Sequence, residues 1–87
     1  HAAQQILKLV LKYAEKNRLE KINSITVELG KIVEHNELIT PENLEYNVRI
    51  IARNTLAENC KILIKRGSKN ELKLVEIDGR QRANSKK

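Results

Sequence analysis

The spacing of apolar side chains predicts a helix and then a strand in the first third of the chain. Over residues 2–19 apolar side chains recur at helical spacing while charged residues cover the opposite face, which is typical of an amphipathic helix. Over residues 22–33 the period becomes two, since Ile25, Val27 and Leu29 alternate with polar residues, and this predicts a strand with one apolar face. The apolar positions of the helix are Ala3, Leu7, Val10, Leu11 and Ala14.

A second helix is predicted to begin at Pro41. Thr40 can cap free backbone amides, Pro41 needs no donor in the first turn, and Glu42 lies at the positive end of the helix dipole. Arg53 and Asn54 suit its last turn. The buried stripe of this helix is expected to consist of Leu44, Val48, Ile51 and Ala52, widened by Tyr46 and Ile50.

Two further alternating segments, residues 60–66 and 71–77, flank the turn from Gly67 to Asn70 and predict an antiparallel hairpin. The order is therefore helix, strand, helix, strand, strand. Because each amphipathic surface needs a partner, we expect a two-layer α+β sandwich with both helices on one face of a three-stranded, mainly antiparallel sheet. Residues 1–79 are predicted to form a single domain and residues 80–87 a flexible basic tail.

Composition limits the possible chemistry. The chain has 87 residues, and its only aromatic side chains are Tyr13 and Tyr46, so a deep aromatic pocket is not expected. No apolar run is long enough to cross a bilayer or to serve as a secretion signal, which predicts a cytoplasmic protein. One cysteine and two histidines do not supply the four ligands of a closed structural zinc site. The sequence begins with His1, which fits a cloning remnant, a processed terminus or the second residue of a native protein.

Four phrases follow one another in a recognisable order: "QQILKLVLKYAEKN", "INSITVELGKI", "TPENLEYNVRI" and "NTLAENCKILI". Together they resemble the nickel-binding domain of the HypA/HybF hydrogenase-maturation family over roughly residues 4–66. The resemblance implies a non-enzymatic metallochaperone that hands Ni(II) to a hydrogenase or urease precursor in partnership with the GTPase HypB. The motifs that carry it are Val27-Glu28-Leu29-Gly30, Pro-Glu-x-Leu-x-aromatic from Pro41 to Tyr46, and Thr-x-x-Glu-x-Cys from Thr55 to Cys60.

The sequence departs from the family pattern between its last two strands. Family members carry a zinc ribbon of two CxxC pairs after the strand that here ends in "ILIKRG", whereas this chain continues at once into "SKNELKLVEIDG". A ribbonless relative and a chain from which the ribbon was excised or left out both fit this sequence.

The metal site is the second departure. The family binds nickel through an amino-terminal Met-His-Glu, using the imidazole and nearby backbone nitrogens, which suit square-planar Ni(II). His1 matches that ligand by resemblance, but Ala2 replaces the Glu, and His1 lies about four residues closer to the helix than in the family. Two interpretations of His1 therefore remain: it is a nickel ligand, or it has no part in metal binding. His35, in a separate loop between Glu34 and Glu37, is interpreted as a solvated residue.

Other functions have weaker support. Cys60 stands where the family has a small apolar residue, so we expect a small buried side chain rather than a nucleophile or ligand. A net charge of +6 favours nucleic-acid binding only in general terms, because no recognised binding motif accompanies it. No P-loop, dinucleotide fingerprint or catalytic triad suggests an enzyme. The alternative to nickel delivery is a relative that acts as a protein-interaction or nucleic-acid-binding module. The basic residues considered are Lys61, Lys65, Arg66, Lys69, Lys73, Arg80, Arg82, Lys86 and Lys87.

Overall fold

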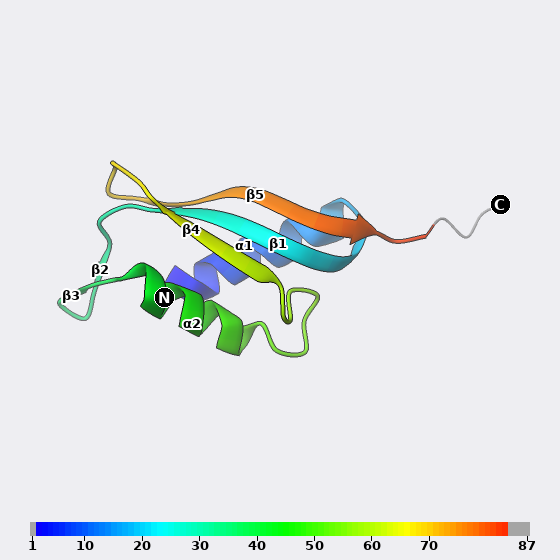
Figure 1. Cartoon of the computed structure of the whole chain (residues 1–87), viewed down its shortest axis with the longest axis horizontal. Coiled ribbons are helices and arrows are strands. Elements are labelled where there is room, and N and C mark those ends of the chain that lie inside the picture. The colour runs from blue at the N-terminus through cyan, green and yellow to red at the C-terminus, as the bar shows by residue number, and fades with distance from the viewer. Residues whose placement is uncertain (1, 84–87) are drawn as a thin grey trace.

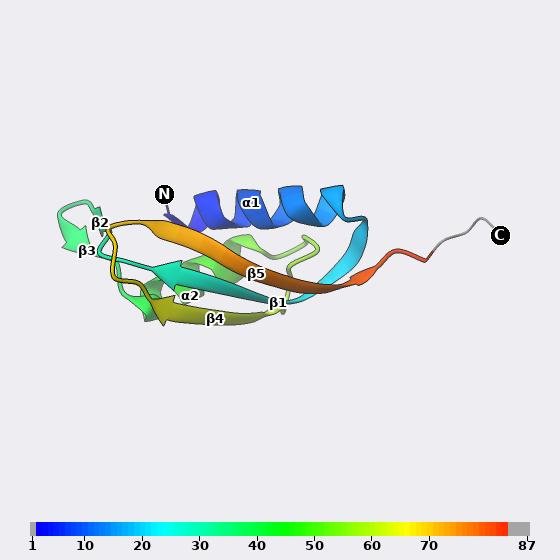
Figure 2. The ribbon, with the colours of Figure 1, turned by 90° about the horizontal axis from the view of Figure 1, so that it is seen from above.

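The computed structural model describes residues 2–83 and has the predicted two-layer α+β architecture. Both helices lie on one face of a three-stranded sheet whose other face is open (Figures 1 and 2). Helix α1 covers β1 and β5, and α2 covers β4. The elements are α1 (Ala2–Lys16), β1 (Leu19–Leu29), β2 (Val33–Glu34), β3 (Glu37–Leu38), α2 (Pro41–Ile51), β4 (Lys61–Arg66) and β5 (Leu72–Gln81).

The core confirms the predicted apolar faces of α1 and the three long strands. Val10 and Ala14 of α1 are fully buried against the sheet, where Ile25 and Val27 are also buried. Ile25 pairs with Ile62 on one side and Ile77 on the other, so a row of isoleucines crosses the sheet beneath the helices. The chain leaves α1 three residues earlier than the pattern predicts, because Arg18 adopts a left-handed φ of 57° and β1 begins at once.

The predicted hairpin between the last two strands is wrong. The strand order is β4-β1-β5, so β4 and β5 lie on opposite sides of β1 rather than beside each other. Helix α2 lies in the crossover from β1 to β4, which brings β4 back parallel to β1, while β5 runs antiparallel to it. The long apolar strand therefore takes the central position, and the sheet is mixed.

The connection from β4 to β5 has to pass over the end of β1, and Gly30 makes room for it. The Gly67 amide donates to the Leu29 carbonyl oxygen at 2.8 Å, and the Gly30 amide donates to the Glu71 carbonyl oxygen at 2.9 Å. A Cβ atom at Gly30 would lie only 1.5 Å from the carbonyl oxygen of Lys69. Gly30 thus permits close approach of two backbones.

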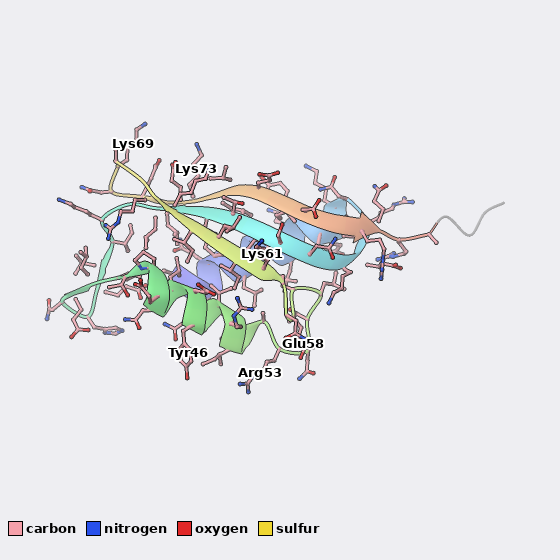
Figure 3. All side chains as sticks on the ribbon, in the orientation of Figure 1. Tyr46, Arg53, Glu58, Lys61, Lys69 and Lys73 are labelled. Atoms are coloured by element: carbon pink, nitrogen blue, oxygen red, sulfur yellow. The ribbon has the colours of Figure 1, made fainter. Side chains whose placement is uncertain are left out.

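Two further predictions are wrong. Tyr46 and Ile50 do not widen the buried stripe of α2, because both side chains are exposed. Tyr46 is 65% exposed and points away from the sheet (Figure 3). Arg80 and Gln81 do not belong to a loose tail, since both pair with β1 as part of β5. Residues 84–87, including the predicted basic residues Lys86 and Lys87, lie outside the described residues. Within residues 2–83, no helix has the length and apolar character needed to cross a membrane.

The start of α2 confirms the predicted cap and gives a first testable prediction. The Thr40 side chain accepts a hydrogen bond from the Asn43 amide at 3.1 Å, and Pro41 opens the helix. Replacing Thr40 with alanine should lower the free energy of unfolding by about 1 kcal/mol, measured by urea denaturation, because that amide loses its partner. Thr40→Ser keeps the hydroxyl and should cost much less; equal costs would show that the cap hydrogen bond is not the cause.

Candidate functional site

A hollow of about 410 Å³ lies where three segments meet: the first turn of α1, the hairpin formed by β2 and β3, and one side of α2. The turn of the hairpin consists of His35 and Asn36. Their φ values of 53° and 65° are both positive, as in the tight two-residue turns that join two antiparallel strands. The hairpin therefore folds back and presents its polar residues to the hollow. Its lining includes Ala2, Ala3, Glu34, His35, Glu37 and Asn47.

A hydrogen bond ties this hairpin to the beginning of α1. The Ala2 amide donates to the Glu34 carboxylate (Oε2) at 2.7 Å. This amide is one of the helix donors that have no intrahelical acceptor, and a carboxylate at this end is also favoured by the helix dipole. Glu34 is half-buried and His35 is exposed. A carboxylate and an imidazole of the hairpin thus lie in the same hollow as the first residues of α1.

The predicted ligand His1 lies outside the described residues, and its neighbour in the sequence, Ala2, lines the hollow. The loop of His35 is not separate from that end of the chain, as the sequence suggested, because Glu34 bonds directly to Ala2. Within residues 2–83, no group of three or more His, Cys, Asp or Glu side chains is arranged to hold a metal ion.

Cys60 is a buried residue at the entrance to β4, as predicted. It is 2% exposed, and burial raises the pKa of its thiol above the ordinary value, against the weaker opposing effects of Arg49 and Lys21. The Arg49 guanidinium donates to the Cys60 carbonyl oxygen at 3.1 Å, so this contact uses the backbone and leaves the sulfur in the core. The thiol stays protonated and packed, which does not favour a nucleophile.

The basic side chains are spread over the open face of the sheet and the β4–β5 connection. Lys61, Lys69 and Lys73 lie apart from one another (Figure 3), and carboxylates lie among the cations. Glu28 is in register with both Lys65 and Lys73. Both tyrosines lie on helices, so neither stands on a strand where it could stack on a base. Within residues 2–83, the charge on this face is therefore mixed.

The comparisons with known proteins agree with the resemblance read from the sequence. No protein-family model matches the chain. Among curated proteins, the chain is similar to "Hydrogenase maturation factor HypA" of Archaeoglobus fulgidus, with 31% identity over 62 residues. These residues make up 71% of this chain and 53% of the relative, so the chain spans about half the length of the protein it matches. The similarity supports a HypA-like relationship over the 62 matched residues.

Proposed function

We propose that this chain is a nickel-binding, non-enzymatic maturation domain that holds Ni(II) at its amino-terminal end and passes it to a hydrogenase precursor, in partnership with a HypB-like GTPase. The observation that carries the proposal is the hydrogen bond from the Ala2 amide to Glu34, which holds a carboxylate, with the neighbouring His35, at the start of α1. The similarity to a hydrogenase maturation factor supplies the biological setting.

The donor set suits nickel. Square-planar Ni(II) prefers nitrogen ligands, including imidazole and deprotonated backbone amides. In the proposed site the His1 imidazole is the principal ligand and backbone nitrogens next to it complete the nitrogen set. His35 lines the same hollow as Ala2, so its contribution to nickel binding is tested alongside that of His1.

Glu34 has a specific role in this proposal. A backbone amide that binds nickel must lose its proton, and the Ala2 amide already directs its proton at Glu34 Oε2 across 2.7 Å. The carboxylate is therefore placed to accept that proton when the nitrogen coordinates the ion. Replacing Glu34 with glutamine removes the acceptor charge and should move nickel binding to higher pH.

The test is calorimetric titration with Ni(II). The parent chain should bind one ion, with affinity falling as the pH drops through about 6.5, where an unperturbed imidazole takes up a proton that competes with the metal. His1→Ala should lower the affinity at least roughly tenfold, consistent with loss of a ligand. Glu34→Gln should weaken binding less, and His35→Ala less than His1→Ala. Glu15→Gln, which removes an exposed carboxylate near the other end of α1, serves as the control and should have no effect.

Two results would contradict the proposal. If the parent chain binds nickel no more tightly than the His1→Ala variant, residue 1 is not a ligand. If Glu34→Gln and Glu15→Gln behave alike, the contact between Glu34 and Ala2 has no part in metal binding. The first result would favour the alternative of a relative that serves as an interaction module without metal.

A further inference from the structure

The hollow between α1, the hairpin of β2 and β3, and α2 has a charge opposite to that of the whole chain. The chain carries a net charge of +6, yet the lining of the hollow includes the carboxylates of Glu34 and Glu37 and no lysine or arginine. Figure 1 shows the hairpin and the start of α2 together at one end of the molecule. A cationic group is therefore attracted locally at the hollow, although the chain as a whole repels it.

The two carboxylates lie directly across the hairpin from each other, since Glu34 of β2 is in register with Glu37 of β3. Like charges that are directly opposite in an antiparallel pair destabilise it. The Ala2 amide donates to Glu34, whereas Glu37 forms no ion pair with another residue of the range 2–83. A positively charged group bound in the hollow would stabilise this pair of strands.

Carboxamide side chains line the α1 and α2 walls of the hollow. Asn43 and Asn47 are one turn apart on α2, and Gln4 lies in the first turn of α1. None of these three side chains forms a hydrogen bond with another residue of the range 2–83. Each offers an acceptor oxygen and two N–H donors, which together match the C=O and N–H groups of a peptide backbone. These walls suit a polypeptide segment better than a lone cation.

Such a segment would also cover apolar side chains of the lining. Leu38 of β3 is 54% exposed and Ile50 of α2 is 36% exposed. The other large apolar side chains of the lining, Ile39, Leu44 and Ile51, are half-buried or buried. Binding sites commonly combine an apolar lining with a few polar groups that fix the orientation of the ligand. The segment therefore needs an apolar side chain beside its cationic one.

We infer that this hollow is a docking site for an extended segment of another protein, in which an arginine lies next to an apolar residue. The guanidinium has five N–H donors in a planar fork, so it can bridge Glu34 and Glu37 and still donate to a carboxamide oxygen. The carboxamides of α2 pair with the backbone of the segment, and its apolar side chain packs on Leu38 and Ile50. This inference adds a partner to the hollow of the proposed function, and it requires neither residue 1 nor a metal ion.

The test is calorimetric titration of the parent chain with a capped hexapeptide of alternating leucine and arginine, in the presence of excess chelator and at about 0.15 M salt, which screens exposed charges. One peptide should bind per chain. A hexapeptide of alternating leucine and glutamate should not bind. A hexapeptide of alternating serine and arginine should bind at least roughly fivefold more weakly, because it buries less apolar surface.

Variants of the lining locate the binding. Glu37→Gln removes one carboxylate of the pair and should raise the dissociation constant of the leucine–arginine peptide roughly fivefold or more. Asn47→Ala removes a carboxamide at an exposed helix position, where alanine preserves the helix, and should raise it roughly threefold. Glu15→Gln removes the same charge near the other end of α1 and should leave the dissociation constant unchanged. His1→Ala should leave it unchanged as well.

No binding of the leucine–arginine peptide, equal binding of the leucine–glutamate peptide, or equal effects of Glu37→Gln and Glu15→Gln would each overturn the docking site. Arginine amide that binds as tightly as the hexapeptide would also overturn it, because the hollow would then take a small cation rather than a segment. A parent chain that binds nickel but not the peptide would overturn this inference alone. Peptide binding without nickel binding would support this inference and contradict the proposed function.

Discussion

Replacing Ile25 with alanine should lower the free energy of unfolding by roughly 2 to 5 kcal/mol. Ile25 is 1% exposed at the centre of β1, in register with Ile62 of β4 and Ile77 of β5. Its truncation opens a cavity between three strands and the helices above them, and neighbours held in a sheet can close such a cavity only in part. A domain of this size has a total stability on the order of 5 to 15 kcal/mol, so much of it would be lost.

The control is Lys61→Ala, measured in the same urea denaturation experiment. Lys61 is exposed on the open face, next to the buried Ile62 in β4. Its loss should change stability by no more than about 0.5 kcal/mol. Equal losses for the two variants would mean that the assignment of the buried and open faces is wrong.

Replacing Gly30 with alanine should have the next largest effect, about 1 to 3 kcal/mol, because the new Cβ would meet the carbonyl oxygen of Lys69 at 1.5 Å. This neighbour is backbone and is held by the hydrogen bonds of the β4–β5 connection, so the connection itself must move. The variant should also speed hydrogen exchange at the Gly30 and Gly67 amides, which bond across the end of β1.

Gly67→Ala is the matched comparison. A Cβ at that position would lie 3.1 Å from Cγ of the Glu28 side chain, which can rotate away. Its cost should be clearly smaller than that of Gly30→Ala. The opposite order would show that the close passage of the connection over β1 does not determine the need for glycine at position 30.

The local structure of this protein is largely encoded in short-range patterns. The period of two around Ile25 and Val27, and the Thr40-Pro41-Glu42 start of α2, depend on neighbouring residues alone, and the structure confirms both. The prediction that Tyr46 widens the buried stripe of α2 is wrong. Tyr46 lies at the margin of this apolar stripe, and only packing decides which residues at the margin are buried.

The strand order could not be predicted from short-range sequence patterns. A Gly-Ser-Lys-Asn connection between two alternating segments is compatible with a hairpin, and nothing local shows that β1 lies between them. The close contact at Gly30 joins residues that are far apart in the sequence, so it becomes visible only once the sheet is assembled.

The candidate site shows the same limit. The resemblance suggests His1 as a nickel ligand, and the sequence predicts that His35 is a solvated loop residue. The structure confirms that His35 is exposed. Its proximity to the start of α1 depends on the hairpin of β2 and β3 folding back, through a contact between Ala2 and Glu34 that spans 32 positions of the chain. The turn residues His35 and Asn36, flanked by Glu34 and Glu37, were the local signal for that hairpin.

The most direct test of the nickel proposal is the amide NMR spectrum of isotopically labelled protein during addition of one equivalent of Ni(II). The account predicts that signals of Ala2, Ala3, Glu34 and His35 change first and together, that His1→Ala removes the changes, and that the sheet amides stay in place. Changes that gather instead around Cys60 or along the basic open face, or a spectrum that does not respond to the ion, would contradict a nickel site at the amino-terminal hollow.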